Sequence, residues 1–303
     1  MKKVYWRPRT VSRTGLGLIA IISLAGLLVV EQFRTERRQP HFDLKLAAAQ
    51  RAREAFDIIK SARVDLGPPI DDETDPLETG IVGLPMSPVT TVTGYLNAKQ
   101  TSVNPNFAAV VIDMLKEAGV EPDDVVAMGV SGSFPALNAC AFAAVESLGA
   151  KPVSIASVSA SNWGANVPDL LWIDMERYLF EAGALKNRSI AASIGGYMDS
   201  GRGLSDDARQ GVIDSINENG LTLIDDEDFA ANVARRLETY RKAADGRPIK
   251  AYINVGGGAA SVGTEVGKEL FSPGLNTRTP PRAELLTGVM PTLSQQGVPC
   301  IHL

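Results

Sequence analysis

The stretch Gly129-Val-Ser-Gly-Ser-Phe-Pro135 joins an apolar run to an Ala-rich segment, and it places Ser131 at a corner between an expected strand and an expected helix. A serine at such a corner is exposed as a nucleophile in the G-x-S-x-G turn, although Ser133 stands here where that motif has its last glycine. Two other interpretations stay open. Ser133 could cap the helix with Phe134 and Pro135 in its first turn, or the helix N-terminus could bind an anion or a carboxylate.

A nucleophilic serine needs a base, and the base needs an acid that orients it. The chain has two histidines: His41 lies on an expected helix near the N-terminus, and His302 follows the serine along the chain, as in a serine, acid, histidine order. Loop positions make Asp174 and Asp199 the candidate acids. Glu176 lies two residues after the first of these, so the two side chains do not face each other on a helix, and we interpret Glu176 as part of a solvated face. The candidate catalytic residues are therefore Ser131, Asp174, Asp199 and His302.

Two further loops follow expected strands and are rich in small or polar residues. The loop 157–169 could form a polar pocket with an aromatic wall, and three successive glycines in the loop 254–261 would let the backbone approach a ligand closely. A plain turn between a strand and a helix is the alternative for the glycine loop. The candidate ligand-binding residues are Ser133, Asn162, Trp163, Asn166, Gly256, Gly257 and Gly258.

The motifs that hold cofactors and metals are absent from the sequence. Ser261 stands where the G-x-G-x-x-G pattern has its last glycine, and no G-x-x-x-x-G-K-[ST] occurs. Two cysteines are too few for a Cys-rich zinc site, and no H-E-x-x-H is present. We therefore expect no cofactor and no metal. Cys140 is expected to be a small buried thiol, while a Cys140–Cys300 disulfide stays open.

Charge is distributed unevenly along the chain. Residues 1–38 carry a net charge of +6, and the remaining residues carry −11. An acidic body excludes a typical nucleic-acid binder, whose domain is basic. A basic leader in front of an apolar segment suits a protein that lies at a membrane.

The segment 14–30 contains 17 residues without a charge, which is the short end of what a bilayer-spanning helix needs. No good cleavage site follows, so we expect an uncleaved signal anchor in the cell membrane. More Lys and Arg residues precede the segment than follow it, which predicts a cytoplasmic N-terminus and an extracytoplasmic body. The expected organisation is a basic cytoplasmic leader (1–13), the transmembrane anchor (14–30), a membrane-proximal helix (41–64) and an α/β domain (65–303).

Apolar β runs alternate with helical segments after residue 104, beyond a connector over 66–88 that is rich in Pro, Gly and Asp. The expected strands are 124–130, 152–158, 190–194, 221–224 and 249–255, and the expected helices are 104–118, 135–148, 171–181, 205–219 and 227–244. This alternation predicts an α/β fold with a parallel, Rossmann-like sheet and helices on both faces. Residues 297–303 indicate a turn and the start of a buried strand. Since a parallel sheet usually continues into a covering helix, we expect a chain truncated at its C-terminus.

Four segments together resemble one bacterial family, the poly-gamma-glutamate system proteins, often called the W component. They are residues 130–138 (VSGSFPALN), 157–166 with Asn-Trp-Gly-Ala-Asn, 174–176 (DME) and 252–258 (YINVGGG). The resemblance covers most of the chain, anchor included, and implies that members continue past residue 303. It also implies a place beside the poly-gamma-glutamate synthase complex at the membrane. It implies a pathway and not a reaction, so no catalytic residue follows from it.

The expected function is therefore that of a membrane-anchored accessory protein of poly-gamma-glutamate synthesis or export. One alternative is a serine hydrolase or transferase that acts on γ-glutamyl bonds through Ser131, and another is a non-catalytic scaffold of the synthase complex. Poly-gamma-glutamate is a polyanion, so a body of net charge −11 should repel it along its length. A single γ-glutamyl chain end, held at a helix N-terminus, is physically easier to bind.

Overall fold

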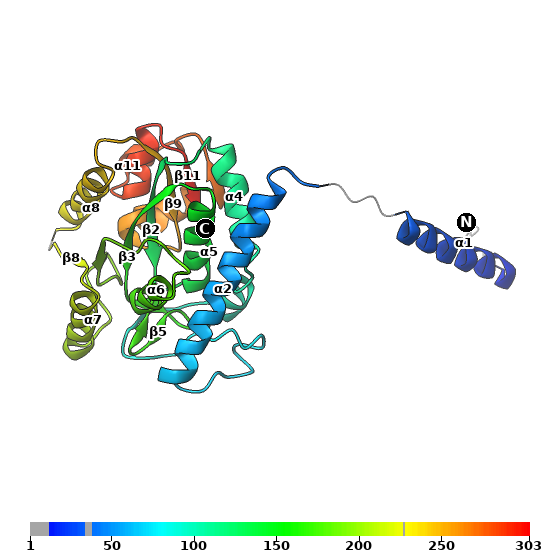
Figure 1. Cartoon of the computed structure of the whole chain (residues 1–303), viewed down its shortest axis with the longest axis horizontal. Helices are drawn as coiled ribbons and strands as arrows, with labels where there is room; N and C mark the ends of the chain where they lie inside the picture. The colour runs from blue at the N-terminus through cyan, green and yellow to red at the C-terminus, as the bar shows by residue number, and fades with distance from the viewer. Residues whose placement is uncertain (1–11, 34–37, 227) are drawn as a thin grey trace, which may run out of the picture. The chain divides into compact units, whose positions relative to one another are not determined.

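The computed structural model describes residues 12–33, 38–226 and 228–303, which fall into two compact units, Met1–Phe42 and Asp43–Leu303. In the first unit, α1 (Arg13–Gln32) is one continuous helix (Figure 1). Its N-cap Ser12 accepts a hydrogen bond from the Gly15 amide at 3.1 Å. By length and composition α1 can cross a membrane, and none of its side chains is buried. Residues 1–11 of the predicted basic leader lie outside the described residues.

The second unit is a mixed α/β structure around a seven-stranded sheet with the order β10-β11-β9-β2-β3-β7-β8. Every neighbouring pair is parallel except β10 and β11, which are antiparallel. The strands are β2 (Val125–Ser131), β3 (Lys151–Ser157), β7 (Ala191–Ser193), β8 (Thr222–Ile224), β9 (Ile249–Asn254), β10 (Gly274–Asn276) and β11 (Cys300–His302). The predicted α/β class and the mostly parallel sheet are confirmed.

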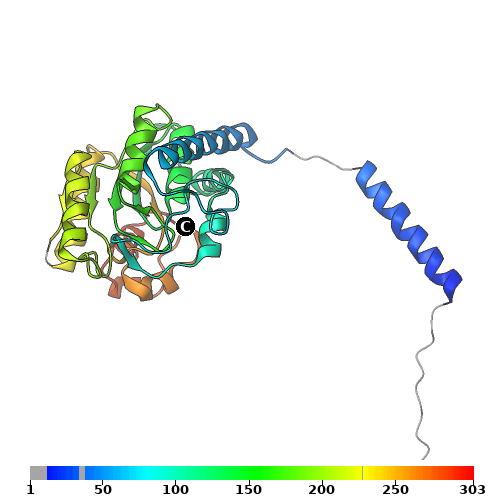
Figure 2. The ribbon, with the colours of Figure 1, turned by 90° about the horizontal axis from the view of Figure 1, so that it is seen from below.

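Helices cover both faces of this sheet. Along β2, Val126, Met128 and Val130 belong to one hydrophobic cluster, while Val125 and Ala127 belong to another, because successive side chains of a strand point to opposite faces. The helices in the first cluster are α2 (Phe42–Leu66), α4 (Phe107–Glu117), α5 (Pro135–Ser147), α6 (Trp172–Glu181) and α7 (Asp206–Glu218). The helices in the second are α8 (Phe229–Ala243), α9 (Ala259–Val262) and α11 (Val289–Gln295). In Figures 1 and 2, α7 and α8 (yellow) lie along one side of the unit, away from α2 (blue).

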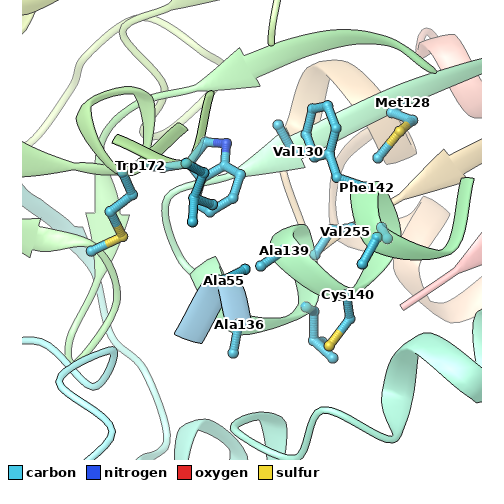
Figure 3. Packing of buried hydrophobic residues seen from close by; sticks show 14 of the residues in the cluster. Ala55, Met128, Val130, Ala136, Ala139, Cys140, Phe142, Trp172 and Val255 are labelled. Atoms are coloured by element: carbon cyan, nitrogen blue, oxygen red, sulfur yellow. The ribbon is translucent and has the colours of Figure 1, made fainter. Parts of the chain in front are cut away.

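The helix α5 is almost wholly buried, because its many alanines let the sheet, α4 and α2 approach it closely. Figure 3 shows its Phe142 beside Val130 and Trp172, and the rings of Phe142 and Trp172 lie 6.3 Å apart. Cys140 is buried on the same helix, and Cys300 is buried in the second cluster, on the opposite face. Both thiols are free, and burial raises the pKa of each to about 12. The prediction of a small buried thiol at Cys140 is confirmed, and the two cysteines do not pair.

Short elements occupy the loops that the alternation pattern left unassigned. They are β1 (Thr90–Val92), α3 (Leu96–Ser102), β4 (Ala160–Ser161), β5 (Asn166–Val167), β6 (Leu170–Leu171), α10 (Thr264–Leu270) and the 3₁₀ helix η1 (Ala283–Leu285). β1 pairs in parallel with β4, which ties the end of the connector to the loop after β3. The predicted helix over 104–118 begins at Phe107, because the Asn104 side chain accepts a hydrogen bond from the Asn106 amide and forms a turn ahead of the helix. The first residue of the predicted helix 227–244, Glu227, lies outside the described residues.

Candidate functional site

A cavity of about 530 Å³ lies at the carboxyl ends of β2, β3, β7 and β9. The chain passes from β2 through β3 and β7 to β8 on one side of the sheet, and then returns to β9 and β11 on the other. Ligand sites of open parallel sheets occur at such a reversal, in the crevice beyond the strand ends. The wall of the cavity is built from residues 91–95, 98–99, 195–199, 257–259 and from Ser131, Ser133, Phe134, Ser157, Ser159, Ser161, Thr264 and Lys268.

Ser131 and Ser133 both line this cavity, but neither side chain caps α5. The Ser131 hydroxyl accepts a hydrogen bond from the Ser133 amide at 3.2 Å, and the Ser133 hydroxyl accepts one from the Ser161 amide at 3.1 Å. The N-cap of α5 is Phe134, which makes no side-chain cap bond, and Pro135 is in the first turn. The interpretation of Ser133 as a helix cap is therefore wrong, because its hydroxyl ties the turn to the loop after β3.

Lys99 of α3 is a cavity residue that the sequence did not reveal. Its side chain is buried, its Nζ donates to the Ser133 carbonyl oxygen, and the same Nζ lies 3.5 Å from the centre of the Phe134 ring. Burial lowers the pKa of Lys99 to about 8. The segment 96–102 is too short to show a helical pattern, and only the tertiary fold brings this lysine to the carboxyl end of β2.

Asp199, one of the two candidate acids, lines the cavity, yet it is not a free carboxylate. Its Oδ2 accepts a hydrogen bond from Arg236 Nη2 at 2.6 Å, and its Oδ1 accepts one from the Ser193 hydroxyl at 2.7 Å. Arg236, on α8, also donates through Nε to the Asn232 side chain at 3.1 Å, so both members of the buried pair are satisfied. Met198 and Asp199 have φ values of 51° and 59°, a left-handed conformation that costs free energy for residues other than glycine. The ion pair between Asp199 and Arg236 holds this strained segment of the cavity wall in place.

His302 does not lie in the cavity wall. It is on β11, its neighbour across the ladder is Asn254 of β9, and Asn254 Nδ2 lies 2.8 Å from His302 Nδ1. β9 separates it from the strand of Ser131, and adjacent strands are about 4.8 Å apart. Burial, with a smaller contribution from Lys268, lowers the pKa of His302 and favours the neutral imidazole. The structure does not bring His302 to Ser131, because β9 lies between β11 and β2 and the His302 ring is bonded to Asn254.

Asp174 is also outside the cavity, where it stabilises the first turn of α6. Its Oδ2 accepts a hydrogen bond from the Leu171 amide at 2.9 Å, and its Oδ1 accepts one from Asn219 Nδ2 at 2.7 Å. Burial raises the pKa of Asp174, against these hydrogen bonds. Its role in this structure is that of a helix-capping carboxylate, and it does not contact the cavity.

Glu176 is fully buried, so its assignment to a solvated face is wrong. Its carboxylate accepts hydrogen bonds from Trp172 Nε1 at 2.9 Å and from the Ser189 hydroxyl at 2.8 Å. Burial raises the pKa of Glu176 to about 7, because the loss of hydration outweighs these bonds. The helix period alone did not reveal that this face of α6 meets the segment before β7.

Asn162, Trp163 and Asn166 lie behind the cavity wall. Asn166 Oδ1 accepts a hydrogen bond from the Leu84 amide at 2.8 Å, and Asn162 Oδ1 accepts one from the Gly94 amide at 2.9 Å. The Trp163 amide donates to the Leu84 carbonyl oxygen at 2.8 Å. These bonds hold the residues 84–94, which supply part of the wall, so the three residues position the site and do not line it.

The glycine loop after β9 divides between wall and support. Gly257 and Gly258 line the cavity, whereas Gly256 does not and has a φ of +83°. A Cβ at Gly257 would lie 2.2 Å from Lys268 Cε, so the Lys268 side chain lies directly over this loop. A Cβ at Gly258 would meet only the Ser157 hydroxyl, at 3.8 Å. The backbone at Gly257 is approached closely by the Lys268 side chain, and the backbone at Gly258 faces open space in the cavity.

The cavity is therefore lined by several hydroxyl groups and by the buried ammonium group of Lys99, and it lies beyond the carboxyl ends of parallel strands, where ligands of open α/β sheets bind. Among the described residues, no three His, Cys, Asp or Glu side chains come together as metal ligands would. Comparison of the chain with protein-family models, with curated proteins and with solved structures finds no match.

Proposed function

We propose that this chain is a membrane-anchored accessory protein of bacterial poly-gamma-glutamate synthesis or export, and that its α/β unit holds one γ-glutamyl chain end in the cavity. The cavity at the carboxyl ends of β2, β3, β7 and β9 is the observation that carries the proposal. It combines serine and threonine hydroxyls with the buried cation Lys99, which suits a polar ligand bearing a carboxylate. The resemblance in sequence supplies the pathway.

Size and charge favour an end of the polymer over its length. A volume of about 530 Å³ lies within the range of small-ligand sites and holds a short terminal segment of a chain. The body of the protein carries a net charge of −11, so an extended run of polymer carboxylates would be repelled. Only a group inside the cavity escapes this repulsion, because Lys99 and Lys268 both line it.

The order of the parallel strands supports a finer description of the fold as Rossmann-like. In such doubly wound sheets the chain starts in the centre, builds one half outward and then returns to build the other. Here the central strand is β2, β3, β7 and β8 form one half, and β9 and β11 form the other. In a doubly wound sheet the two halves diverge at the central strand, and this explains why the cavity lies beside the carboxyl end of β2.

Deletion of the gene tests the proposal when it is combined with a variant that fills the cavity. Gly258→Leu places a side chain in the cavity, and the φ of Gly258 is one that any residue adopts. Gly211→Leu is the matched control, because Gly211 is exposed on α7 and a Cβ there meets nothing within 4 Å. We expect deletion to lower the surface polymer, and we expect the wild type and Gly211→Leu, but not Gly258→Leu, to restore it at equal membrane levels.

Unchanged amount and chain length of the polymer after deletion would overturn the proposal. Restoration by Gly258→Leu would leave the protein in the pathway and make it a scaffold of the synthase complex, because the cavity would then be dispensable. Membrane levels of both variants are measured by immunoblot, so that a folding defect is separated from a blocked cavity.

A further inference from the structure

The ammonium group of Lys99 has few partners for a buried cation. Lys99 is 3% exposed, and among the described residues its only hydrogen-bond acceptor is the carbonyl oxygen of Ser133. On a second side, the ammonium group faces the Phe134 ring, with which it makes a cation–π contact. A lysine ammonium has three donors, so one remains for an acceptor in the cavity that Lys99 lines.

No carboxylate balances this charge in the part of the chain that the structure describes. The other titratable groups in the cavity wall are Tyr95, Tyr197, Asp199 and Lys268. Asp199 is neutralised by Arg236 at 2.6 Å, and the side chains of the two tyrosines are largely exposed and carry no carboxylate. Lys268 is itself a cation. Burial is accordingly the single cause that lowers the pKa of Lys99 to about 8.

We propose that Lys99 is the residue that recognises a carboxylate in the cavity, and that the ligand binds together with a proton when Lys99 is neutral. The identification of this carboxylate with a γ-glutamyl chain end rests on the proposed function. The donor that Lys99 leaves free points to an acceptor of negative charge, and a carboxylate oxygen is such an acceptor. A bound carboxylate supplies the missing counter-charge and makes the charged lysine the stable form inside the cavity.

The direction of the pH dependence follows from this exchange. Below pH 7 Lys99 is already charged in the empty cavity, so binding needs no additional proton. Above pH 8 the empty cavity holds mostly neutral lysine, and part of the binding free energy is used to protonate it. For a group whose pKa is about 8 in the empty cavity and is raised by a bound carboxylate, the affinity falls by up to about tenfold between pH 7 and pH 9.

Calorimetric titration of the full chain in lipid nanodiscs tests this. The ligand is N-acetyl-γ-glutamylglutamate, whose blocked amine does not titrate in this pH range, and two buffers of different ionisation enthalpy report the protons taken up. We expect uptake of about one proton at pH 9 and almost none at pH 7. Lys99→Met should weaken binding at least tenfold at pH 7 and abolish the uptake, whereas Lys242→Gln, an exposed lysine of α8, should change neither.

Lys99→Met is not expected to unfold the protein, because it replaces a buried charge without a counter-ion by an apolar side chain of similar length. Its melting temperature should equal or exceed that of the wild type. Equal affinity at both pH values and in Lys99→Met would overturn the inference while leaving the proposed function intact.

The α-linked isomer, N-acetyl-α-glutamylglutamate, separates the inference from the proposed function. Equally tight, Lys99-dependent binding of both isomers would support carboxylate recognition and would argue against a γ-glutamyl ligand. If neither isomer binds, the inference is overturned.

Discussion

The hydroxyl of Ser131 accepts a hydrogen bond from the Ser133 amide, and in the described part of the chain no imidazole contacts it. Lys99, the amine in the same cavity, donates to the carbonyl oxygen of Ser133 and not to this hydroxyl. A serine without a base is a poor nucleophile. We therefore expect a fluorophosphonate probe to label neither the wild type nor Ser131→Ala, as measured by intact mass and with a known serine hydrolase as the positive control.

Stoichiometric labelling of the wild type that Ser131→Ala abolishes would contradict this expectation. It would restore the alternative of a hydrolase or transferase that acts on γ-glutamyl bonds. Labelling that survives in Ser131→Ala but disappears in Ser133→Ala would place the nucleophile two residues later in the same turn.

At the scale of residues, the sequence predicted the loops of the site better than the roles of the side chains in them. Ser131 and Asp199 line one cavity because the carboxyl ends of parallel strands meet at one edge of the sheet. Lys99 was missed because its partner, Ser133, is 34 residues away and no local pattern marks the contact. The ion pair that neutralises Asp199 was missed for the same reason, since Arg236 comes from α8, 37 residues later.

At the scale of elements, the turn between β9 and α9 contains two glycines with opposite requirements. Gly256 has a φ of +83°, and a Cβ there would lie 3.3 Å from Ser131 Cβ, whereas Gly258 has a φ of −57° and room for a Cβ. Gly256→Ala should lower the free energy of unfolding by about 1–2 kcal/mol, the cost of a left-handed L-residue. Gly258→Ala should change it by less than about 0.5 kcal/mol.

Chemical denaturation of both variants of the full chain in detergent measures the difference, and Gly258→Ala is the matched control for Gly256→Ala. Equal stabilities of the two variants would show that the turn relaxes to a conformation that tolerates a side chain at both positions. A larger loss in Gly258→Ala than in Gly256→Ala would contradict the described geometry of the turn.

Long elements with a clear period were predictable, and short ones held by tertiary contacts were not. β2 and α5 begin and end within one residue of the predicted bounds, because a continuous apolar run and an Ala-rich segment between Pro135 and Gly149 are strong local signals. β10 has three residues and exists only through its antiparallel pairing with β11. α3 has seven residues, too few for a helical period, although it carries the lysine of the site.

At the scale of the whole molecule, α1 can cross a membrane, and the bias of charge around it predicts the side on which the α/β unit lies. Five Lys or Arg residues precede the apolar segment, and three follow it within eight residues of Val30. Basic residues are retained on the cytoplasmic side, so we propose a cytoplasmic N-terminus and an extracytoplasmic α/β unit. A polymer chain end leaving the cell would then meet the cavity outside the membrane.

Reporter fusions after Leu303 test this topology. We expect an alkaline phosphatase fusion to be active and a green fluorescent protein fusion, which folds in the cytoplasm, to be dark. The matched control exchanges the bias: Lys2, Lys3, Arg7 and Arg9 become Gln, while Glu31 and Gln32 become Lys, so that more basic residues follow the apolar segment 14–30 than precede it. This variant should lose phosphatase activity and gain fluorescence. If the wild-type phosphatase fusion is inactive and the green fluorescent protein fusion is fluorescent, the α/β unit lies in the cytoplasm. The proposed chain end would then be bound before export.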